Sequence, residues 1–396
     1  AQALREMIIG IGDTKMDGFM LRSGFQITVS SEVMSILAVA SSIRDLRERM
    51  GRIVVAFDKR GTPITTGDLE VDGAMTALMF RAINPNLMQT LEGQPVLVHA
   101  GPFANISIGH SSVVADRLGL RLCEYHVTES GFGADIGFEK FWNLKCRMSG
   151  LMPNCSVIVA TIRALKMHGG GPPVVPGRPL DEVYTKPSPG LVEKGLGNLM
   201  AHIETVKKSQ IAPVVCINHF HTDSEEEIDM VRRAAESLGV PTAVSRHWEH
   251  GGEGALELAE AVVEACEKPP RLRFLFEDDM AIKDKIARIA IEVYGADGVT
   301  YSELAEKRIA AIQANPELNQ LGICMVKTHL SLSHDPTLKG RPKGWVLPVR
   351  DVLVYRGAGL IVPVAGDIKL MPGTASDPAF RRIDVEVETG KVTGLF

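Results

Sequence analysis

The sequence predicts an α/β protein whose main sheet is doubly wound and mostly parallel, with helices on both faces. Short β-branched runs alternate with segments of helical periodicity from the start of the chain to about residue 265, an order typical of parallel sheets. From about residue 270 the pattern changes to two helices followed by mixed strands. With 396 residues, the chain is long enough for about two or three domains, and we interpret the last part as a smaller lobe.

The first 150 residues alternate between expected strands and expected helices. The strands are expected at residues 7–12, 25–29, 52–57, 95–101 and 124–129. The helices are expected at residues 30–51, 67–83, 113–122 and 138–148. Ser30 or Ser31 is a suitable N-cap for the first helix. Asn84 should end the second helix, because the residue before a proline avoids the α conformation.

The second half of the chain continues this order and then changes. Strands are expected at residues 155–161, 213–218, 241–245, 345–354 and 360–364, with helices at residues 223–239, 281–294 and 301–314. Residues 169–179, GGGPPVVPGRP, form the segment richest in glycine and proline, which predicts a surface loop or lid and a candidate domain boundary. Residues 383–396 alternate around a Thr-Gly turn and predict a terminal hairpin.

Composition and charge favour a small-molecule partner. The formal charge is −5, with 43 Lys and Arg against 48 Asp and Glu, and without a basic block neither nucleic acid nor an anionic membrane surface is expected as a partner. The six cysteines have no CxxC spacing, which suits reduced thiols in an intracellular protein. No apolar run approaches the roughly 18 residues of a membrane span. The chain opens without Met, so we expect a fragment or a processed chain.

Residues 213–254 predict a βαβ unit with two aromatic side chains at its mouth. PVVCIN and PTAVS are the expected strands, and the helix between them has Asp223 or Ser224 as its cap. In such units ligands bind beyond the carboxyl ends of the strands. Phe220 and Trp248 each follow a strand end, where they can stack on a flat ring. The alternative is that both aromatics belong to the core.

A group of potential cations follows the strand expected at residues 155–161. Arg163, Lys166 and His168 precede the glycine run. Arginine offers a planar fork, lysine a point charge and histidine a group that titrates near neutrality, a set that suits a phosphate or carboxylate. The alternative is a set of solvated charges on a turn.

The segment TESGFGADIGFEKF places Gly131, Gly133 and Gly137 between an expected strand and a helix. This spacing is one residue longer than the dinucleotide fingerprint, and glycines there allow close approach of a ligand or of a neighbouring strand. Asp135 and Glu139 would repel a phosphate unless a cation lay between their carboxylates and the phosphate. A plain structural turn is the alternative.

Two other chemistries have weaker support. His219, His221, His247 and His250 flank the strand ends and raise a metal-hydrolase hypothesis, although no cysteine joins them and we expect no metal site there. A serine nucleophile lacks the GxSxG elbow. The sequence nowhere contains GxxxxGK[ST], the loop that cradles nucleotide phosphates.

Long segments of the chain resemble formate–tetrahydrofolate ligase, also called formyltetrahydrofolate synthetase. The matching segments are SEVMSILAVA, RIVVAFDKRGTPIT, INPNLMQTLEGQPVLVHAGPFANI, VTESGFGADIGFEKFWNLKCR, VIVATIRALKMHGGGP and KTHLSLSHDPTLKGRP. Within them, MQTLEG, HAGPFANI, KMHGGGP and KTHLSLSHDP look closest to the synthetase domain of eukaryotic trifunctional folate enzymes. The resemblance therefore leaves a cytoplasmic or a mitochondrial location open.

The resemblance implies a fold and a reaction. The family fold carries a nucleotide domain of P-loop NTPase type and additional smaller α/β lobes. Formate attacks the terminal phosphate of ATP to give formyl phosphate, which then formylates tetrahydrofolate, with Mg²⁺ on the phosphates and a monovalent cation allowed. The family's pterin clamp maps onto Phe220 and Trp248. Arg163, Lys166 and His168 are our candidates for the acyl-phosphate site, and we expect a homo-oligomer, a dimer or a tetramer.

The resemblance also predicts differences from the family. Its N-terminal phosphate-binding loop is expected to be absent, which leaves the nucleotide domain incomplete. Ile108 stands where the family has a histidine, with His110 displaced, and residues 371–376 depart from a Pro-Gly-Leu-Pro segment.

We divide the chain accordingly into part of a nucleotide-binding domain (residues 1–180), a folate-binding lobe (181–270) and a C-terminal mixed lobe (271–396). The alternative to a ligase is an inactive folate-binding or assembly fragment.

Overall fold

The computed structural model describes residues 2–174, 179–374 and 376–394. The chain divides into two compact units, one of residues 1–31 with 369–396 and one of residues 32–368. Three earlier predictions fall partly outside the described residues. These are the lid at 169–179, the altered segment at 371–376, which lacks position 375, and the terminal hairpin, which lacks its last two residues. The division at residues 180 and 270 stays a prediction.

The smaller unit is built from two hairpins. β1 (Met7–Ile9) pairs antiparallel with β2 (Leu21–Ser23), and the short helix α1 (Thr14–Asp17) lies between them. β14 (Asp384–Glu386) pairs antiparallel with β15 (Lys391–Thr393), which confirms the terminal hairpin. The strand expected at 25–29 is wrong, because this segment turns into a 3₁₀-helix at Thr28–Ser30. Two further 3₁₀ turns lie at Gln2–Arg5 and Ala379–Arg381.

The larger unit begins with helices and antiparallel ladders. Its first elements are α2 (Glu32–Val39), α3 (Ile43–Gly51), β3 (Val54–Phe57), β4 (Pro63–Thr65), α4 (Asp72–Met79), β5 (Asn86–Gln89), β6 (Pro95–Val98) and α5 (Val113–Leu122). The helix expected at 30–51 is two helices, because Ser42 caps a new one by accepting the Asp45 N–H. β3 pairs antiparallel with β4, and β5 with β6.

The prediction of a parallel sheet in the first 150 residues is therefore wrong. The loops after β3 and β5 are short, so each strand folds back on its neighbour, whereas a parallel pair needs a long crossover. The strand expected at 124–129 is also absent from the described part of the chain, where those residues form a loop. The next helix contains two π-helical segments, Ala134–Phe138 and Phe141–Lys145, and continues as α6 (Cys146–Ser149).

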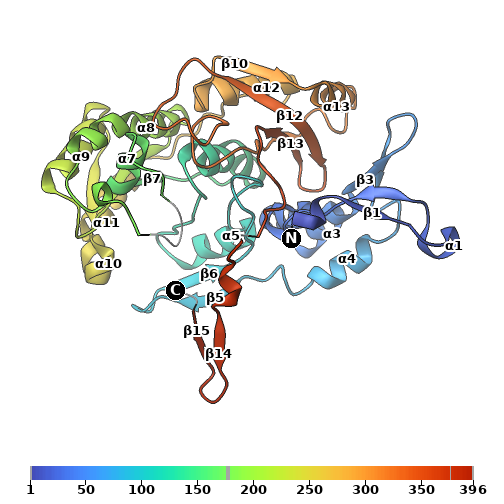
Figure 1. Ribbon diagram of the computed structural model, residues 1–396, viewed down its shortest axis with the longest axis horizontal. Coiled ribbons are helices and arrows are strands. Elements are labelled where there is room, and N and C mark those ends of the chain that lie inside the picture. Colours follow the sequence, from blue (N-terminus) through green and yellow to red (C-terminus); the bar gives the residue numbers. More distant parts are fainter. Residues whose placement is uncertain (1, 175–178, 375, 395–396) are drawn as a thin grey trace. The chain divides into compact units, whose positions relative to one another are not determined.

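The expected parallel sheet forms from residue 155 onward (Figure 1). β7 (Cys155–Ala160), β8 (Ala212–Asn218) and β9 (Thr242–Ser245) are parallel and lie in that order. The crossovers use α7 (Ile162–His168), α8 (Pro189–Lys208) and α9 (Glu225–Ser237). After β9 come α10 (His247–His250), a 3₁₀ segment (Gly251–Ala255) and α11 (Leu256–Cys266). A 3₁₀ turn at Glu182–Tyr184 precedes α8.

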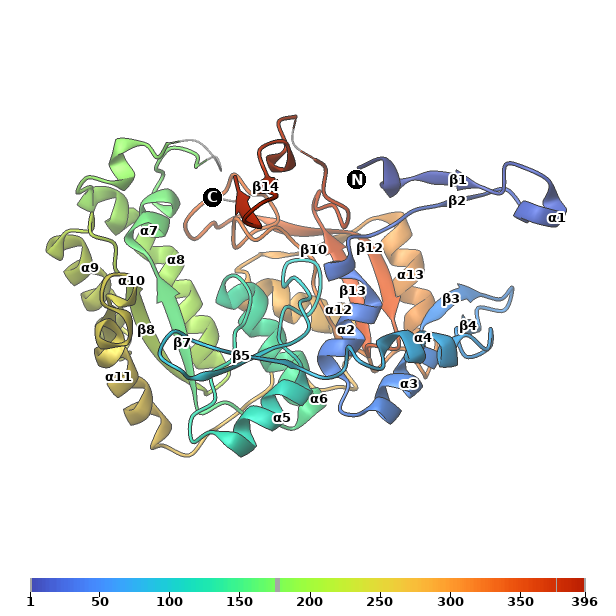
Figure 2. The ribbon, with the colours of Figure 1, turned by 90° about the horizontal axis from the view of Figure 1, so that it is seen from below.

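Helices cover this sheet on both faces. Val215 and Ile217 of β8 belong to a core cluster with residues of α8 and α9, while Cys216 lies near Glu257 of α11. Because neighbouring residues of a strand point to opposite faces, α11 lies on the face opposite to α8 and α9. Figure 2 shows α8 and α11 on either side of β7 and β8. A parallel sheet with helices on both faces is thus present, although its crossover helices α8 and α9 lie on one face, so the doubly wound strand order is not seen in these three strands.

The remaining sheet is mixed. β10 (Gly298–Tyr301) runs parallel to β12 (Val346–Tyr355), which pairs antiparallel with β13 (Leu360–Ala365), and β11 (Gly322–Ile323) runs parallel to β13. α12 (Ile282–Arg288), its π-helical continuation Ile289–Val293 and α13 (Glu303–Gln313) pack around it. Mixed strands after residue 270 are thus present, but the sheet has four strands against three in the parallel sheet, and residues 369–396 belong to the other compact unit. No helix in the described ranges has both the length and the hydropathy needed to cross a bilayer.

Candidate functional site

The carboxyl ends of β8 and β9 lie side by side, as the βαβ prediction requires. Asn218 is in register with Ser245, and the His219 N–H donates to the Ser245 carbonyl at 3.0 Å. Phe220 follows the end of β8, and Trp248 lies in α10 after β9. The two aromatic residues therefore lie on adjacent loops at one edge of the sheet.

Neither aromatic residue is part of the core. Trp248 is 87% exposed, so the core alternative is wrong for it, and Phe220 is half-buried. The Arg163 guanidinium lies 4.0 Å from the centroid of the Phe220 ring, within the range of a cation–π interaction. Arg163 also donates to the Thr222 hydroxyl at 3.2 Å. Arg163 thus lies at the strand ends, against one face of Phe220.

The loop that carries Phe220 is fixed by the start of α9. Asp223 Oδ2 accepts the Phe220 N–H at 2.9 Å, and burial raises the pKa of the Asp223 carboxyl. Ser224 is the N-cap of α9 and forms a capping box with Glu227. A capping box satisfies two backbone donors at once, so the chain between β8 and α9 has little freedom.

Lys166 does not face the strand ends. Its ammonium group and the Glu227 carboxylate both have 0% exposure and lie 2.8 Å apart. Lys166 Nζ also donates to the Lys186 carbonyl at 2.8 Å, and Glu227 accepts the Ser188 N–H at 2.7 Å. The pair therefore ties α7 to the starts of α8 and α9.

His168, at the other end of α7, is not a cation near neutrality. Burial, together with the nearby His202 and Lys339, lowers the pKa of His168 to about 4. Its Nδ1 accepts the Gly340 N–H at 3.2 Å, which requires that nitrogen to be unprotonated. The expectation that His168 titrates near neutrality is wrong, and the structure does not gather Arg163, Lys166 and His168 into one cationic cluster.

His168 instead lines a cavity of about 750 Å³ beside β7. Its walls also come from the glycine-rich loop, from α8 and from α11, and include Phe132, Gly133, Asn198, His202 and Val262. Val159 of β7 lines it too and is 63% exposed. The cavity is thus partly apolar, and its polar part lies where α7, α8 and the glycine-rich loop meet.

The glycine-rich loop packs mainly against the protein itself. A Cβ atom at Gly137 would lie 2.2 Å from the Gly131 carbonyl oxygen. His110 holds the same turn, since its Nε2 lies 2.8 Å from the Gly137 carbonyl oxygen. Burial lowers the pKa of His110 well below its ordinary value, so this histidine is neutral. Ile108 is fully buried in the core, which leaves both positions structural.

Two acidic residues of this loop are buried close to cations that the sequence did not indicate. Asp135 Oδ2 lies 2.8 Å from Lys327 Nζ, and both side chains are almost completely buried. His202 Nδ1 lies 3.8 Å from Asp135 Oδ1. Although burial opposes the charged form, Lys327 and His202 lower the pKa of Asp135, whereas burial raises that of Glu139 to about 7. Lys327 therefore neutralises Asp135 within the fold.

The four histidines near the strand ends make other contacts. Arg246 Nη1 lies 2.8 Å from His219 Nε2, and His247 Nδ1 lies 2.9 Å from the Ser245 hydroxyl. His221 and His250 are exposed. Within the described residues no three His, Cys, Asp or Glu side chains are grouped so as to hold a metal ion.

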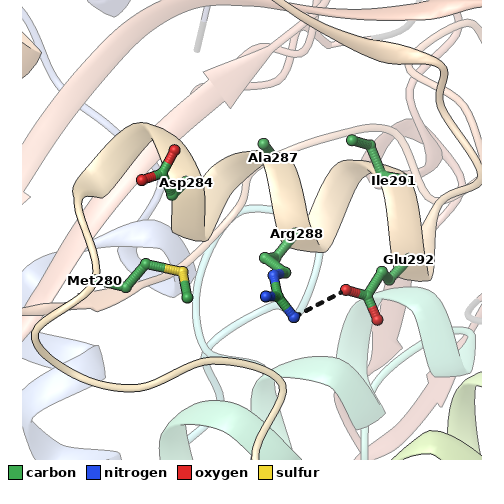
Figure 3. Close-up of a pocket in the computed structure, with 6 residues that line it drawn as sticks. All are labelled: Met280, Asp284, Ala287, Arg288, Ile291 and Glu292. Atoms are coloured by element: carbon green, nitrogen blue, oxygen red, sulfur yellow. Dashed lines mark hydrogen bonds and ion pairs between the residues drawn. The ribbon is translucent and has the colours of Figure 1, made fainter.

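A second cavity, of about 400 Å³, lies along α12 and its π-helical continuation (Figure 3). It is lined by Met280, Asp284, Ala287, Arg288, Ile291 and Glu292. Arg288 and Glu292 are paired with each other at 3.3 Å. Because Arg288 and Glu292 already pair with each other, they offer little to a ligand.

Comparison with known proteins gives a consistent family. The family model described as formate–tetrahydrofolate ligase matches residues 1–396. Proteins named formate–tetrahydrofolate ligase from Dehalococcoides mccartyi are 65% identical over 396 residues, which is 100% of this chain and 66% of the relative. The protein of that name from Desulfotalea psychrophila is 64% identical over 396 residues, covering 100% of this chain and 71% of the relative.

The chain spans about two thirds of the length of these curated relatives. The relatives named above are bacterial, so the expected likeness to eukaryotic trifunctional enzymes, and with it a mitochondrial location, has no support from them. The absence of a phosphate-binding loop and the P-loop type of the fold stay predictions.

Proposed function

The chain belongs to the formate–tetrahydrofolate ligase family, and we propose that it provides the tetrahydrofolate-binding part of that enzyme. The proposed overall reaction is the ATP-dependent ligation of formate to tetrahydrofolate through formyl phosphate. In the second step the folate nitrogen forms a bond to the formyl carbon, the bond from that carbon to the phosphate oxygen breaks, phosphate leaves, and the nitrogen loses its proton to solvent.

The observation that carries the proposal is the pair of aromatic residues at adjacent strand ends. A pterin is a flat ring system, and stacking on an aromatic side chain is worth about 1–3 kcal/mol per ring by analogy with nucleic-acid bases. Trp248 is exposed and Phe220 is half-buried. We propose that the pterin ring binds between them.

Arg163 is the proposed anion-binding residue of this site. It lies in the first turn of α7 and contacts the Phe220 ring, so an anion on Arg163 would lie close to the pterin. Its guanidinium fork suits the oxygens of an acyl phosphate, and fixed cations stabilise charge that develops in a transition state. Lys166 and His168 are proposed to position α7, since Lys166 is fully paired and His168 is neutral.

ATP and formate are proposed substrates of the complete enzyme. Mg²⁺ on the phosphates and a monovalent cation are likewise proposals for the complete enzyme. Within the described residues no three His, Cys, Asp or Glu side chains are grouped so as to hold a metal ion, and no step is assigned to either ion. A homo-oligomer and a cytoplasmic location are also proposals. The alternative of an inactive assembly fragment is not favoured, because the relatives match this chain over its whole length at 58–65% identity.

Tetrahydrofolate binding to this chain, measured by isothermal titration calorimetry, tests the proposal. Phe220→Ala and Trp248→Ala are expected to raise Kd about 5- to 150-fold, the factors that correspond to about 1–3 kcal/mol. Trp248→Phe should retain most of the affinity because it keeps an aromatic face. Phe80→Ala, which changes an exposed phenylalanine at the C-cap of α4, is the matched control. Unchanged affinity in both clamp variants would overturn the proposal.

A further inference from the structure

The tip of the β5–β6 hairpin contacts the segment that carries Trp248. Glu92, in the turn between β5 and β6, accepts the Gly252 N–H through Oε1 at 2.7 Å. Figure 1 shows this hairpin extending toward α10. We infer that Glu92 is a positioning residue that holds the Trp248 segment in place for pterin binding, an inference that rests on the proposed function.

The two glycines after α10 make this contact possible. A Cβ atom at Gly252 would lie 2.5 Å from Glu92 Oε2 and 2.7 Å from Oε1. Gly251 has a φ of +58°, and a Cβ there would lie 3.2 Å from Glu92 Oε1. Distances under 3.0 Å exclude a side chain at Gly252 unless the carboxylate moves. Gly252 therefore presents a bare N–H to Glu92.

The Trp248 segment is a short loop that is closed at its base. The Arg246 N–H donates to the Gly254 carbonyl at 2.7 Å, and Arg246 Nη1 lies 2.8 Å from His219 Nε2. These contacts fix residues 246 and 254 against the strand ends. Glu92 reaches the loop between these two points, at Gly252, from a distant part of the sequence.

Such a contact matters here because core packing does not hold the indole. Trp248 is 87% exposed, whereas Trp142 and Trp345 are buried. The position of an exposed side chain depends on the backbone that carries it, and Gly252 follows Trp248 by about one turn of chain. A carboxylate accepting a backbone N–H is among the stronger kinds of hydrogen bond. Losing it should let the loop, and Trp248 with it, sample other positions.

Two variants test this role. Glu92→Ala removes the acceptor and should raise the Kd for tetrahydrofolate about 3- to 10-fold, the factor expected for one hydrogen bond at an exposed site. Glu92→Gln keeps a carbonyl acceptor at the same place and should restore most of the affinity. Gly252→Ala should also weaken binding, because the added Cβ atom displaces the Glu92 carboxylate from its present position. Glu260→Ala, which changes an exposed glutamate of α11, is the matched control and should bind normally.

A spectroscopic measurement separates positioning from loss of fold. Trp248 is the exposed tryptophan, so acrylamide quenching reports mainly on it. Glu92→Ala should change the quenching and the emission anisotropy of that tryptophan while leaving the urea midpoint of unfolding within experimental error of the wild type. A lower midpoint with unchanged quenching would overturn the inference, because the residue would then be merely structural.

The two hypotheses fail in different ways. If the clamp variants Phe220→Ala and Trp248→Ala bind tetrahydrofolate as the wild type does, the proposed function fails. If both clamp variants bind weakly while Glu92→Ala and Gly252→Ala bind normally, the clamp holds and the role of Glu92 is overturned. Weakened binding in Glu92→Ala with recovery in Glu92→Gln supports the inference.

Discussion

Replacing Lys166 by methionine should destabilise the fold strongly. Lys166 and Glu227 both have 0% exposure and lie 2.8 Å apart. Methionine is close to lysine in volume but leaves the Glu227 carboxylate buried without its counter-ion. Removing one partner of a buried ion pair typically costs about 3–5 kcal/mol of unfolding free energy, because the remaining charge is uncompensated.

The local geometry supports the full size of this loss. Glu227 keeps hydrogen bonds from the N–H groups of Ser188 and Ser224, which stabilise a carboxylate but do not neutralise it. The Lys186 carbonyl also loses its bond from Lys166. Since these groups join α7, α8 and α9, the loss should lower the stability of the whole parallel sheet. The double variant Lys166→Met with Glu227→Gln removes the buried charge and should recover part of the lost unfolding free energy.

Urea denaturation followed by the fluorescence of the buried tryptophans measures this change. Lys186→Met is the matched control, because Lys186 pairs with Glu182 at the surface, where both side chains are mostly exposed, and such pairs are worth about 0–1 kcal/mol. A loss below about 1 kcal/mol in Lys166→Met, combined with loss of ligase chemistry in the complete enzyme, would refute the structural reading. Lys166 would then act on the substrate.

Two further predictions concern His168 and the glycine-rich loop. The pKa of His168 is about 4 in the fold against an ordinary 6.5, so the unfolded chain binds more protons between these values, and stability present above pH 6.5 should be lost as the pH falls toward 4. His168→Gln should reduce the slope of the unfolding free energy against pH by up to about 1.4 kcal/mol per pH unit. Equal slopes for the wild type and the variant, measured by urea denaturation between pH 4 and 6.5, would contradict this prediction. Gly137→Ala places a Cβ atom 2.2 Å from the Gly131 carbonyl and should cost about 1–3 kcal/mol. Gly190→Ala in α8 meets no atom within 4 Å and should leave the urea midpoint nearly unchanged, so equal midpoints for the two variants would speak against the close packing of this loop.

Local sequence patterns predicted well those elements whose partners are close in the chain. α5 and the strands β7 and β8 lie where β-branched runs and helical periodicity placed them, and Ser224 caps α9 as one of the two residues suggested. The same patterns failed before residue 150, where three expected strands lie in antiparallel hairpins. Strand periodicity does not distinguish a parallel from an antiparallel neighbour.

The sequence likewise predicted only some of the contacts in the candidate site. The sequence predicted the positions of Phe220 and Trp248 at neighbouring strand ends, because parallel strands bring their carboxyl ends to one edge of the sheet. Their role in folate binding stays a proposal. The pairing of Asp135 with Lys327, and of Lys166 with Glu227, gave no local signal, since each partner comes from a different segment. The sequence also predicts His168 to titrate near neutrality, which is wrong, because a sequence motif does not reveal the burial that lowers the pKa of His168.

The amino-acid order was therefore sufficient for the family resemblance, the α/β class and the two aromatic residues at the strand ends, all of which follow from short patterns. Only the folded chain decided which charges are solvated and which are buried, and that the turn after β5 reaches Gly252. Such contacts depend on the meeting of segments far apart in the sequence, and their energies depend on exclusion of water, which is a property of the packed structure.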